Sequence, residues 1–470
     1  MKPCHLFRHK DSCFAYHLDT GRFIRVEKDA YELLELRDRL GPDEATAAFL
    51  RSHPGKEKIV SETDELERAG FFEPAAPVIA DEAEFERELD SRCSGSCNNL
   101  VLSVASGCNL ACRYCYCGVC RDKLPDLGLM SEETAMLAVD GLFKSADPSA
   151  DIRVTFFGGE PLLNKRVIFR TVKRCNEWAE KHGVRAKYSI TTNATLMDED
   201  TARLIADNNF GLMVSLDGPK ELHDAQCPTR GGEGSYDLAV AGIRLLMKYR
   251  KNVTVRCTMA HPAPDAMRLI EFFRDFGFTR VVLGTVDNPA FPSECDFTES
   301  DEAEFSLCID EKIIPWMLSE RAEGRDPVYD PFTDIDDFQS EKEHPEHVRA
   351  LRCGACHGAM AVGPDGTLYP CHRFAGMKDW ALGDIATGAD MEKCKRFWRN
   401  YRAAMRSVCD ECWACRICTG PCPWEIARAD GTFVRPQRTC AGTRTWIEQG
   451  VHYLDSAERL GLNAKKGNTK

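Results

Sequence analysis

The sequence lacks any apolar run long enough to cross a membrane as a helix. Its first ten residues, Met-Lys-Pro-Cys-His-Leu-Phe-Arg-His-Lys, contain no apolar segment of the kind found in secretion signals. No block of basic residues is present, and the formal net charge is −13 with a pI of about 5.5. These absences argue against a membrane protein and against a nucleic-acid-binding protein, and we expect a cytoplasmic chain.

Cysteine, in contrast, is abundant and accounts for 24 of the 470 residues. Disulfide bonds, zinc sites and iron–sulfur clusters could each explain so many thiols. Disulfides belong mostly to oxidising compartments, which a cytoplasmic chain does not meet. Metal ligation is therefore the favoured explanation, and the spacing of the cysteines has to show which metal they bind.

The length allows roughly three domains, and the first is expected over residues 1–85. Short alternating runs predict three strands, and apolar periodicity predicts three short helices after them. This order indicates a small winged-helix-like domain, followed by an acidic linker over residues 86–98. The strands are expected at His5–Arg8, Cys13–Leu18 and Arg22–Val26, and the helices around Leu33–Leu40, at Asp43–Arg51 and at Ser61–Ala69.

Residues 99–290 alternate between strands and amphipathic helices. Such alternation predicts an α/β fold with a parallel sheet and right-handed crossovers, in which six strand–helix units form an open partial barrel. In barrels of this kind the chemistry collects at the C-terminal ends of the strands. The strands are expected at Leu100–Val104, Ile152–Phe157, Lys187–Thr191, Gly211–Ser215, Val253–Met259 and Arg280–Val286.

Beyond the barrel we expect three more parts. Residues 291–350 are charged and contain prolines, which favours a helical connector. Cysteines return within residues 351–450, which are predicted to form a metal-binding domain. Residues 451–470 are expected to be a tail.

Three cysteines follow the first barrel strand closely, in Cys108-Asn-Leu-Ala-Cys112-Arg-Tyr-Cys115. Thiolates on one tight loop can hold three irons of a [4Fe–4S] cluster and leave the fourth iron open. An open iron can chelate the amino and carboxylate groups of S-adenosylmethionine (SAM) and pass it the electron that breaks a C–S bond. The motif resembles that of the radical SAM superfamily, which implies a partial (β/α)6 barrel. The nearby thiols of Cys117 and Cys120 leave some choice of ligands open.

Later strand ends carry further motifs of the same superfamily. Gly158-Gly159-Glu160-Pro161 resembles its GGEP motif, whose glycines let the backbone approach the methionine amino group while Glu160 anchors the loop. Thr192-Asn193-Ala194-Thr195-Leu196 resembles TNGTL with alanine in place of glycine, and Ser215-Leu216-Asp217-Gly218-Pro219 resembles S-x-D-G-P. The resemblance implies SAM contacts from Tyr114, Gly158, Gly159, Glu160, Asn193, Ser215, Asp217 and Arg256, with Arg256 pairing with the SAM carboxylate.

The cysteines of the last domain follow a second recognisable order. Cys353-x2-Cys356 precedes Gly366-x4-Cys371, and Cys409-x2-Cys412-x5-Cys418-x3-Cys422 precedes Cys440. This order resembles the SPASM domain, an appendage of radical SAM enzymes that holds two auxiliary [4Fe–4S] clusters. A zinc ribbon is the alternative, although the interval between the CxxC pairs is longer than a ribbon usually shows. The resemblance implies Cys353, Cys356, Cys371 and Cys422 as ligands of auxiliary cluster I, and Cys409, Cys412, Cys418 and Cys440 as ligands of auxiliary cluster II, with Cys415 in surplus.

SPASM enzymes mostly modify peptides or proteins, and the N-terminal segment agrees with such a substrate. Its strand–helix order and the closing Gly70-Phe71-Phe72 resemble the recognition element of enzymes that modify ribosomally made peptides (a RiPP recognition element). Such an element binds the leader of a peptide as an added strand at an exposed sheet edge. The resemblance implies a peptide or small-protein partner that carries a leader.

The sequences around the late cysteines resemble those of thioether-forming maturases. Cys371-His372-Arg373-Phe374 and Cys412-Trp413-Ala414 are similar to segments of the maturases of quinohemoprotein amine dehydrogenase and of six-cysteine peptides. Thr419-Gly420-Pro421-Cys422 departs from the Gly-rich sequence usual there. His372 stands where sulfatase maturases carry an Asp, which argues against formylglycine formation.

We therefore expect a radical SAM enzyme that joins a Cys sulfur to a side-chain carbon of Asp or Glu in a peptide substrate. A flavodoxin or ferredoxin is the expected type of electron donor. Other peptide chemistry is the alternative: C–C cross-linking, epimerisation, or the oxidation of Ser or Cys. A non-enzymatic iron–sulfur electron carrier is a further alternative, although a carrier has no use for a GGEP loop and an open iron.

Overall fold

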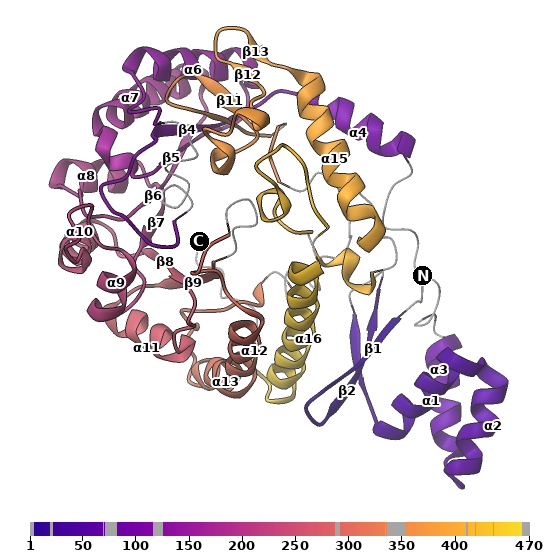
Figure 1. The fold of residues 1–470 in the computed structure, drawn as a ribbon. Helices are drawn as coiled ribbons and strands as arrows, with labels where there is room; N and C mark the ends of the chain where they lie inside the picture. Colours follow the sequence, from indigo (N-terminus) through magenta and orange to yellow (C-terminus); the bar gives the residue numbers. More distant parts are fainter. Residues whose placement is uncertain are drawn as a thin grey trace.

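The computed structural model shows a ring-like barrel, a cysteine-rich domain beside it and a projecting N-terminal domain (Figure 1). Phe71, Phe72, Cys117, Cys120 and Thr419 lie outside the described residues. Among the described helices, none is long and apolar enough to cross a membrane. The structure describes residues 4–18, 22–68, 70, 82–115, 126–286, 292–333, 335, 353–356, 358–409, 412–418, 420–435 and 437–462.

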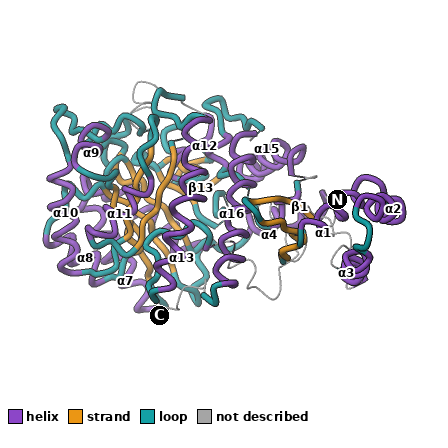
Figure 2. Tube along the Cα trace, turned by 90° about the horizontal axis from the view of Figure 1, so that it is seen from below, coloured by secondary structure: helices purple, strands orange, loops and turns teal. Residues whose placement is uncertain are grey.

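Six parallel strands form the barrel in the order β4-β5-β6-β7-β8-β9, which confirms the predicted α/β fold. Helices connect successive strands and surround the sheet on its outer side (Figures 1 and 2). The strands are β4 (Asn99–Ala105), β5 (Ile152–Gly158), β6 (Ala186–Thr192), β7 (Gly211–Ser215), β8 (Thr254–Met259) and β9 (Arg280–Thr285). The helices are α6 (Glu132–Ser145), η1 (Pro161–Asn164), α7 (Lys165–His182), α8 (Glu199–Asp207), α9 (Lys220–Gln226), α10 (Tyr236–Tyr249) and α11 (Ala266–Phe276).

Alternation along the strands separates an apolar outer face from a polar inner face. In β8, Val255, Cys257 and Met259 are buried in the main core, whereas Arg256 and Thr258 between them are only half-buried. Because successive side chains of a strand point to opposite faces, Arg256 and Thr258 face the enclosed side of the ring. The fold thus holds the outer face against the helices and leaves polar side chains for the interior.

The cysteine-rich domain extends the barrel sheet. β10 (Met360–Val362) pairs in parallel with β4, and β11 (Thr367–Tyr369) returns antiparallel after a turn at Gly366, which confirms the predicted hairpin. The pairing of β10 with β4 was not predictable from spacing, because the two strands are far apart in sequence. The other elements are β12 (Gly383–Asp384), β13 (Gly388–Ala389), η4 (His372–Phe374), η5 (Lys378–Trp380), α15 (Met391–Cys409), η6 (Trp413–Arg416), η7 (Pro423–Ile426) and α16 (Gln437–Arg459).

The N-terminal domain has the predicted order of three antiparallel strands and three helices. Leu33, Phe49 and Ile59 form its own helical core, and its helices project away from the barrel (Figures 1 and 2). His5 stacks on Trp413 with a ring separation of 3.7 Å, which joins this domain to the cysteine-rich domain. The elements are β1 (Cys4–His9), β2 (Ser12–His17), β3 (Phe23–Val26), α1 (Lys28–Leu40), α2 (Pro42–Ser52) and α3 (Glu57–Arg68).

Two expected domain boundaries are wrong because helices run through them. α4 (Glu82–Ser94) crosses the boundary at residue 85, and Phe85 and Leu89 are fully buried where it packs against α15. α16 continues past residue 450 to Arg459, and Val451 on it packs against the N-terminal sheet. Residues 451–459 are therefore part of a packed helix and not of a tail. The connector expected over residues 291–350 contains three helices, as predicted for a helical segment. They are α12 (Glu299–Cys308), η2 (Ile309–Ile313) and α13 (Ile314–Ala322).

Candidate functional site

The two glycines after β5 lie against the backbone that leads into Cys108. Gly159 donates its N–H to the Ala105 carbonyl at 2.9 Å, and the N–H of Glu160 reaches the Gly107 carbonyl at 3.1 Å. A Cβ on Gly158 would overlap the carbonyl oxygen of Ala105, and one on Gly159 would overlap that of Gly107. Gly158 also has a φ of +146°, which disfavours any other residue. The two glycines thus let the backbone after β5 approach the backbone that leads into Cys108, and the expected approach to the methionine amino group stays a prediction.

Glu160 anchors the loop by joining the ends of β5 and β6. Its carboxylate accepts hydrogen bonds from the Thr192 hydroxyl at 2.6 Å, the Asn193 N–H at 2.8 Å and the Leu162 N–H at 2.9 Å. The side chain is 1% exposed, and burial raises the pKa of Glu160 to about 6, although these donors favour the ionised form. The anchoring role predicted for Glu160 is what the geometry shows.

The loop after β6 is tied directly to the cysteine loop. The Asn193 amide donates to the Cys108 sulfur at 3.5 Å and to the Asn109 side-chain oxygen at 3.1 Å. The Asn109 amide in turn donates to the Thr195 hydroxyl at 2.8 Å. Asn193 was expected to contact SAM, and here its amide group is directed at the cysteine loop. Ala194, which replaces the glycine of the motif, has a φ of +60°, a conformation that costs a non-glycine residue roughly 1 kcal/mol.

Asp217 is enclosed by protein donors and is only 1% exposed. One carboxylate oxygen accepts the Thr258 N–H at 2.9 Å. The other accepts the Tyr114 hydroxyl at 2.6 Å and the Cys227 thiol at 3.3 Å. Burial and the neighbouring carboxylate raise the pKa of Tyr114 well above its usual range, so its hydroxyl stays a donor. The polar groups of Asp217 and Tyr114 are thus engaged with each other and with neighbouring protein groups, while the SAM contacts expected of them stay a prediction.

Cys227 is a buried thiol at this site that sequence reasoning missed. It lies within hydrogen-bonding reach of Cys112, and burial is the main cause that raises its pKa. Asp217, His223 and Cys227 bring their ligand atoms within 4.8 Å of one another. His223 is already engaged, however, since its Nδ1 accepts the Asp217 N–H at 3.1 Å and its Nε2 meets the Ser235 hydroxyl at 3.0 Å. Cys227 is an isolated cysteine before Pro228, so no spacing pattern in the sequence marks it.

The structure brings together the three cysteines of the predicted cluster loop. The Cys115 N–H donates to the Cys112 carbonyl at 3.1 Å, which forms a tight turn, and the Leu110 N–H reaches the Cys108 sulfur at 3.4 Å. Burial, with smaller contributions from Glu160, Cys112 and Cys115, raises the pKa of Cys108 to about 12. Such crowded thiols ionise readily only beside a cation, so the donor set fits a thiolate-ligated iron cluster.

Ser215 and Arg256 are register partners on β7 and β8. Within the described residues, the Ser215 hydroxyl has no hydrogen-bond partner and is open to a ligand. The guanidinium of Arg256 lies over Gly284 of β9, where a Cβ would overlap it. Arg230, which sequence reasoning missed, places its guanidinium beside Gly107, 3.2 Å from the position of a Cβ there. Arg230 thus brings a cation to the backbone that leads into the cysteine loop, and Arg256 brings another to the inner face of β8 and β9.

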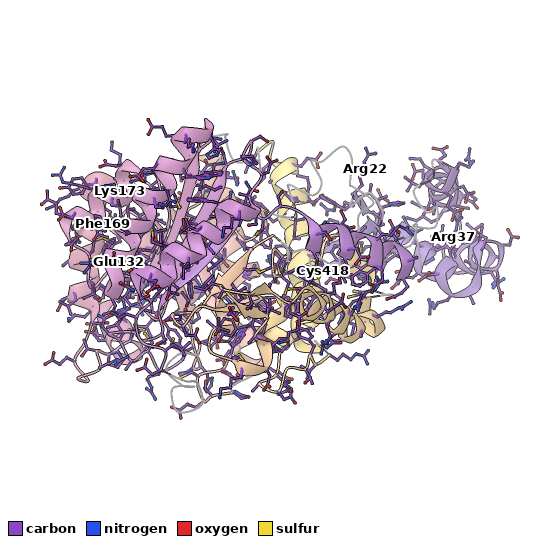
Figure 3. All side chains as sticks on the ribbon, turned by 90° about the horizontal axis from the view of Figure 1, so that it is seen from above. Arg22, Arg37, Glu132, Phe169, Lys173 and Cys418 are labelled. Atoms are coloured by element: carbon purple, nitrogen blue, oxygen red, sulfur yellow. The ribbon has the colours of Figure 1, made fainter. Side chains whose placement is uncertain are left out.

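The eight cysteines expected to hold auxiliary clusters form two groups. Cys371 lies close to Cys422 and Cys353, and Cys356 lies close to Cys371. Burial raises the pKa values of Cys371 and Cys409 to about 12. Figure 3 shows Cys418 of the second group between the barrel helices and the N-terminal helix that carries Arg37. The second group contains Cys409, Cys412, Cys418 and Cys440, with the surplus Cys415 beside Cys409.

Two further thiols near the first group were not predicted. Cys394 of α15 hydrogen-bonds with Cys356, and Cys93 of α4 lies beside Cys394. Both sit on helices whose sequences show only an apolar stripe at these positions, so no ligand spacing marks them. They give the first group more thiols than a single cluster needs.

His372 connects the first auxiliary group to the barrel opening. Its ring lies over Phe157 at the end of β5, with the ring centres 3.9 Å apart. Burial, together with the charge of Arg373, lowers the pKa of His372 to about 4, so the imidazole is neutral at pH 7. The segment after Cys371 thus closes over the strand ends that carry the glycine motif.

Comparisons with known proteins agree with this geometry. Residues 102–274 match the family model of the radical SAM superfamily. A serine-type anaerobic sulfatase-maturating enzyme of Bacteroides thetaiotaomicron is 30% identical over 394 residues, which cover 77% of this chain and 92% of the relative. The chain is a radical SAM protein. A cysteine-type anaerobic sulfatase-maturating enzyme of Clostridium perfringens is 24% identical over 339 residues, covering 69% and 88% of the two chains.

Solved structures show that the radical SAM fold extends over most of the chain. The native enzyme anSMEcpe with bound AdoMet and a Cp18Cys peptide superposes with a TM-score of 0.63 at 20% identity, covering 77% of this chain and 99% of that one. SuiB of Streptococcus suis, bound to its precursor peptide SuiA, gives a TM-score of 0.50 at 15% identity, with coverages of 93% and 99%. As a radical SAM enzyme, the protein uses SAM and a [4Fe–4S] cluster.

Proposed function

We propose that this radical SAM enzyme modifies a Cys-containing peptide or small protein by joining the Cys sulfur to a side-chain carbon of Asp or Glu. The contact of His372 with Phe157 carries the proposal. It joins the segment that follows Cys371 to the end of β5, next to the glycine motif that is proposed to bind SAM. A substrate held there would lie between a group that removes hydrogen and a group that accepts an electron.

Each group of residues has a proposed part in this site. Cys108, Cys112 and Cys115 hold the SAM-binding cluster, while the backbone of Gly158 and Gly159, Ser215 and Arg256 bind SAM. Glu160, Asn193, Tyr114 and Asp217 position the loops around it, as their hydrogen bonds indicate. The proposed ligands of auxiliary cluster I are Cys353, Cys356, Cys371 and Cys422, and those of auxiliary cluster II are Cys409, Cys412, Cys418 and Cys440.

The bound groups supply the 5′-deoxyadenosyl radical that takes a hydrogen atom from carbon, and an acceptor for the electron released when the C–S bond forms. The balance per cross-link is one C–H hydrogen atom to 5′-deoxyadenosine, one proton from the thiol and one electron. The chain's own residues align the target carbon. The reactivity of that carbon toward the radical depends on its position more than on its acidity. His372 and Phe157 cover part of this opening, since the two half-buried rings lie against each other with their centres 3.9 Å apart.

The N-terminal domain is proposed to bind the leader of the substrate. β3 pairs only with β2 among the described strands, so its other side is an open edge. An extended peptide can add to such an edge through backbone hydrogen bonds. The structure of SuiB bound to its precursor peptide SuiA supports a peptide substrate for an enzyme of this architecture.

Formylglycine formation is the second candidate, because the relatives include cysteine-type and serine-type sulfatase-maturating enzymes. The neutral His372, in place of the Asp expected in such enzymes, favours the cross-linking reaction. A flavodoxin or ferredoxin is the proposed electron donor for either reaction.

Co-expression with a candidate Cys-containing peptide, sought among the open reading frames beside this gene, tests the proposal. We expect a product two hydrogen atoms lighter per modification, with a Cys blocked to alkylation and linked to an acidic residue in fragment spectra. A product that carries an aldehyde at the modified position, and in which the other Cys residues keep free thiols, would instead establish the sulfatase-type oxidation. An inverted stereocentre without loss of mass would contradict both reactions.

A further inference from the structure

A short antiparallel pairing joins the cysteine loop to the segment that follows α9. Leu110 and Thr229 form a bridge in this pairing. Three backbone hydrogen bonds keep its register: Ala111 N–H to the Pro228 carbonyl at 2.8 Å, Arg113 N–H to the Gln226 carbonyl at 2.9 Å, and Arg230 N–H to the Asn109 carbonyl at 3.3 Å. Two residues forward from Leu110 and two back from Thr229, the register places Cys112 directly opposite Cys227.

The backbone groups of Cys112 and Cys227 show that the two form a non-hydrogen-bonded pair. The Cys112 carbonyl accepts the Cys115 N–H at 3.1 Å, and the Cys227 N–H donates to the His223 carbonyl at 2.7 Å, so both groups point away from the pairing. In such a pair the Cα atoms are about 4.5 Å apart and the side chains are close. A disulfide joins Cα atoms that are about 4.4–6.8 Å apart. The backbone therefore already has the spacing that a disulfide needs.

The sulfur of Cys227 is directed at the cysteine loop. It lies 3.3 Å from the hydroxyl of Tyr114, which is two residues beyond Cys112, and its thiol donates to the Asp217 carboxylate at 3.3 Å. Cys227 is only 3% exposed, whereas Cys112 is half-buried. An oxidant from solvent therefore reaches Cys112 more easily, and Cys227 is the protected thiol across the pairing from it.

We infer that Cys112 and Cys227 are a modification site, which closes to a disulfide when peroxide strips the iron cluster from the loop. The role of Cys112 as a cluster ligand rests on the proposed function, whereas the pairing of the two residues does not. Hydrogen peroxide oxidises the Cys112 thiol to a sulfenic acid and releases one water. The Cys227 sulfur then forms the S–S bond and displaces the second water. Two thiols and one peroxide thus give one disulfide and two waters.

The disulfide holds Cys112 at a reversible level of oxidation. A sulfenic acid without a neighbouring thiol goes on to sulfinic and sulfonic acids, which a dithiol does not reduce. A dithiol does reduce the disulfide, and it returns two electrons and two protons to the two sulfurs. While the bond lasts, the loop lacks one of its thiolates, so the cluster returns only after reduction. The pair thus makes oxidative loss of the cluster repairable.

Peptide mapping of the full-length enzyme tests the site. The cluster-loaded protein is treated with hydrogen peroxide and an iron chelator, unfolded in N-ethylmaleimide and digested with trypsin. Cleavage at Arg and Lys places Cys112 in the peptide of residues 93–113 and Cys227 in that of residues 221–230. We expect these peptides to be joined in most chains, with fragment spectra that assign the bond to Cys112 and Cys227. Dithiothreitol before alkylation should separate them.

Two variants separate a specific pair from general oxidation of thiols. Cys227→Ser should abolish the link, and it should increase sulfinic and sulfonic acid at Cys112 several-fold. After dithiothreitol and reconstitution it should regain several-fold less of the lost iron than the unmodified enzyme. Cys257→Ala is the matched control, because Cys257 is a fully buried thiol that donates to the Asp217 carbonyl at 3.4 Å but belongs to β8. This variant should form the link like the unmodified enzyme.

Three results would decide against parts of this account. Cys112 joined to Cys108 or Cys115, or oxidised to a sulfinic acid beside an alkylated Cys227, would overturn the inference. Equal recovery of iron by Cys227→Ser and the unmodified enzyme would show that the pair does not protect the loop. If chains that carry the disulfide still bind the full amount of iron, the modification site stands and the proposed ligand role of Cys112 is wrong.

Discussion

The guanidinium of Arg256 rests on Gly284 so closely that any Cβ at that position would overlap it. An alanine there would displace the end of a flexible side chain and leave the backbone in place. Gly284→Ala should therefore weaken SAM binding about ten-fold by losing a charge-assisted contact, with little change in stability. Equilibrium binding of SAM to the anaerobic, cluster-loaded enzyme measures the effect.

Gly141→Ala is the matched control for this experiment. Gly141 lies on the exposed side of α6 and has open space where a Cβ would be. This variant should bind SAM like the unmodified enzyme. Unchanged SAM binding in Gly284→Ala would remove Arg256 from the SAM site.

Glu160 gives the barrel a specific pH dependence. Its pKa in the folded protein is about 6 against an ordinary value of 4.5, a difference worth about 2 kcal/mol. Because the folded-state pKa is raised, the contribution is fully present below the ordinary value and is lost as the pH rises through about 6. The free energy of unfolding in urea should therefore fall for the protein relative to Glu160→Gln as the pH rises. The difference between the two should change by about 2 kcal/mol between pH 4.5 and 7. A constant difference between the two over this range would contradict the raised pKa.

The strand ends of the barrel were predictable because the relevant signals are local. GGEP at residues 158–161 and CxxxCxxC at residues 108–115 each follow a strand, and parallel strands bring their ends to one edge. The anchoring role of Glu160 followed from the same motif. Local pattern and topology together thus predicted the strands whose ends carry these motifs, while their binding of SAM and a cluster stays a proposal.

Contacts between distant segments were not predictable from one sequence. The Cys394–Cys356 contact depends on how α15 packs within the cysteine-rich domain, and the contact of His372 with Phe157 depends on how that domain packs on the barrel. The pairing of β10 with β4 sets that packing, and no spacing rule gives its register. The hydrogen-bond partners of Asp217 were not predictable for the same reason, because Tyr114 and Thr258 lie on two other segments of the chain.

The cluster loop can be tested through iron content and SAM cleavage together. Three cubane clusters imply about twelve irons per chain. Replacing Cys108, Cys112 and Cys115 together by Ala should remove about four of them and all formation of 5′-deoxyadenosine. Cys175→Ala is the control, since Cys175 is a buried core thiol of α7 and should affect neither quantity. Zinc in place of iron in the triple variant would sink the auxiliary-cluster assignment.

Leader binding can be tested at a single backbone N–H of β3. The His17 N–H bonds to the Arg22 carbonyl, and in the antiparallel register Arg25 then points its own N–H away from β2. Arg25→Pro removes that donor from the open edge, whereas Arg25→Ala removes only the side chain. We expect the proline variant to bind a leader-bearing peptide at least about ten-fold more weakly, and the alanine variant to bind it nearly normally. Fluorescence anisotropy of a labelled precursor peptide measures both, and equal binding by the two variants would exclude pairing at this edge.

Deuterium transfer from the substrate to 5′-deoxyadenosine tests the proposed reaction most directly. The peptide is made with deuterium on the side-chain methylene of the acidic residues near its Cys, and the enzyme is supplied with SAM and reductant. The proposal predicts one deuterium in the 5′-deoxyadenosine formed, together with a product that has lost one deuterium and carries a sulfur–carbon bond at that position. Unlabelled 5′-deoxyadenosine from a peptide that is nevertheless modified would contradict the account, because hydrogen would then have been taken from another carbon.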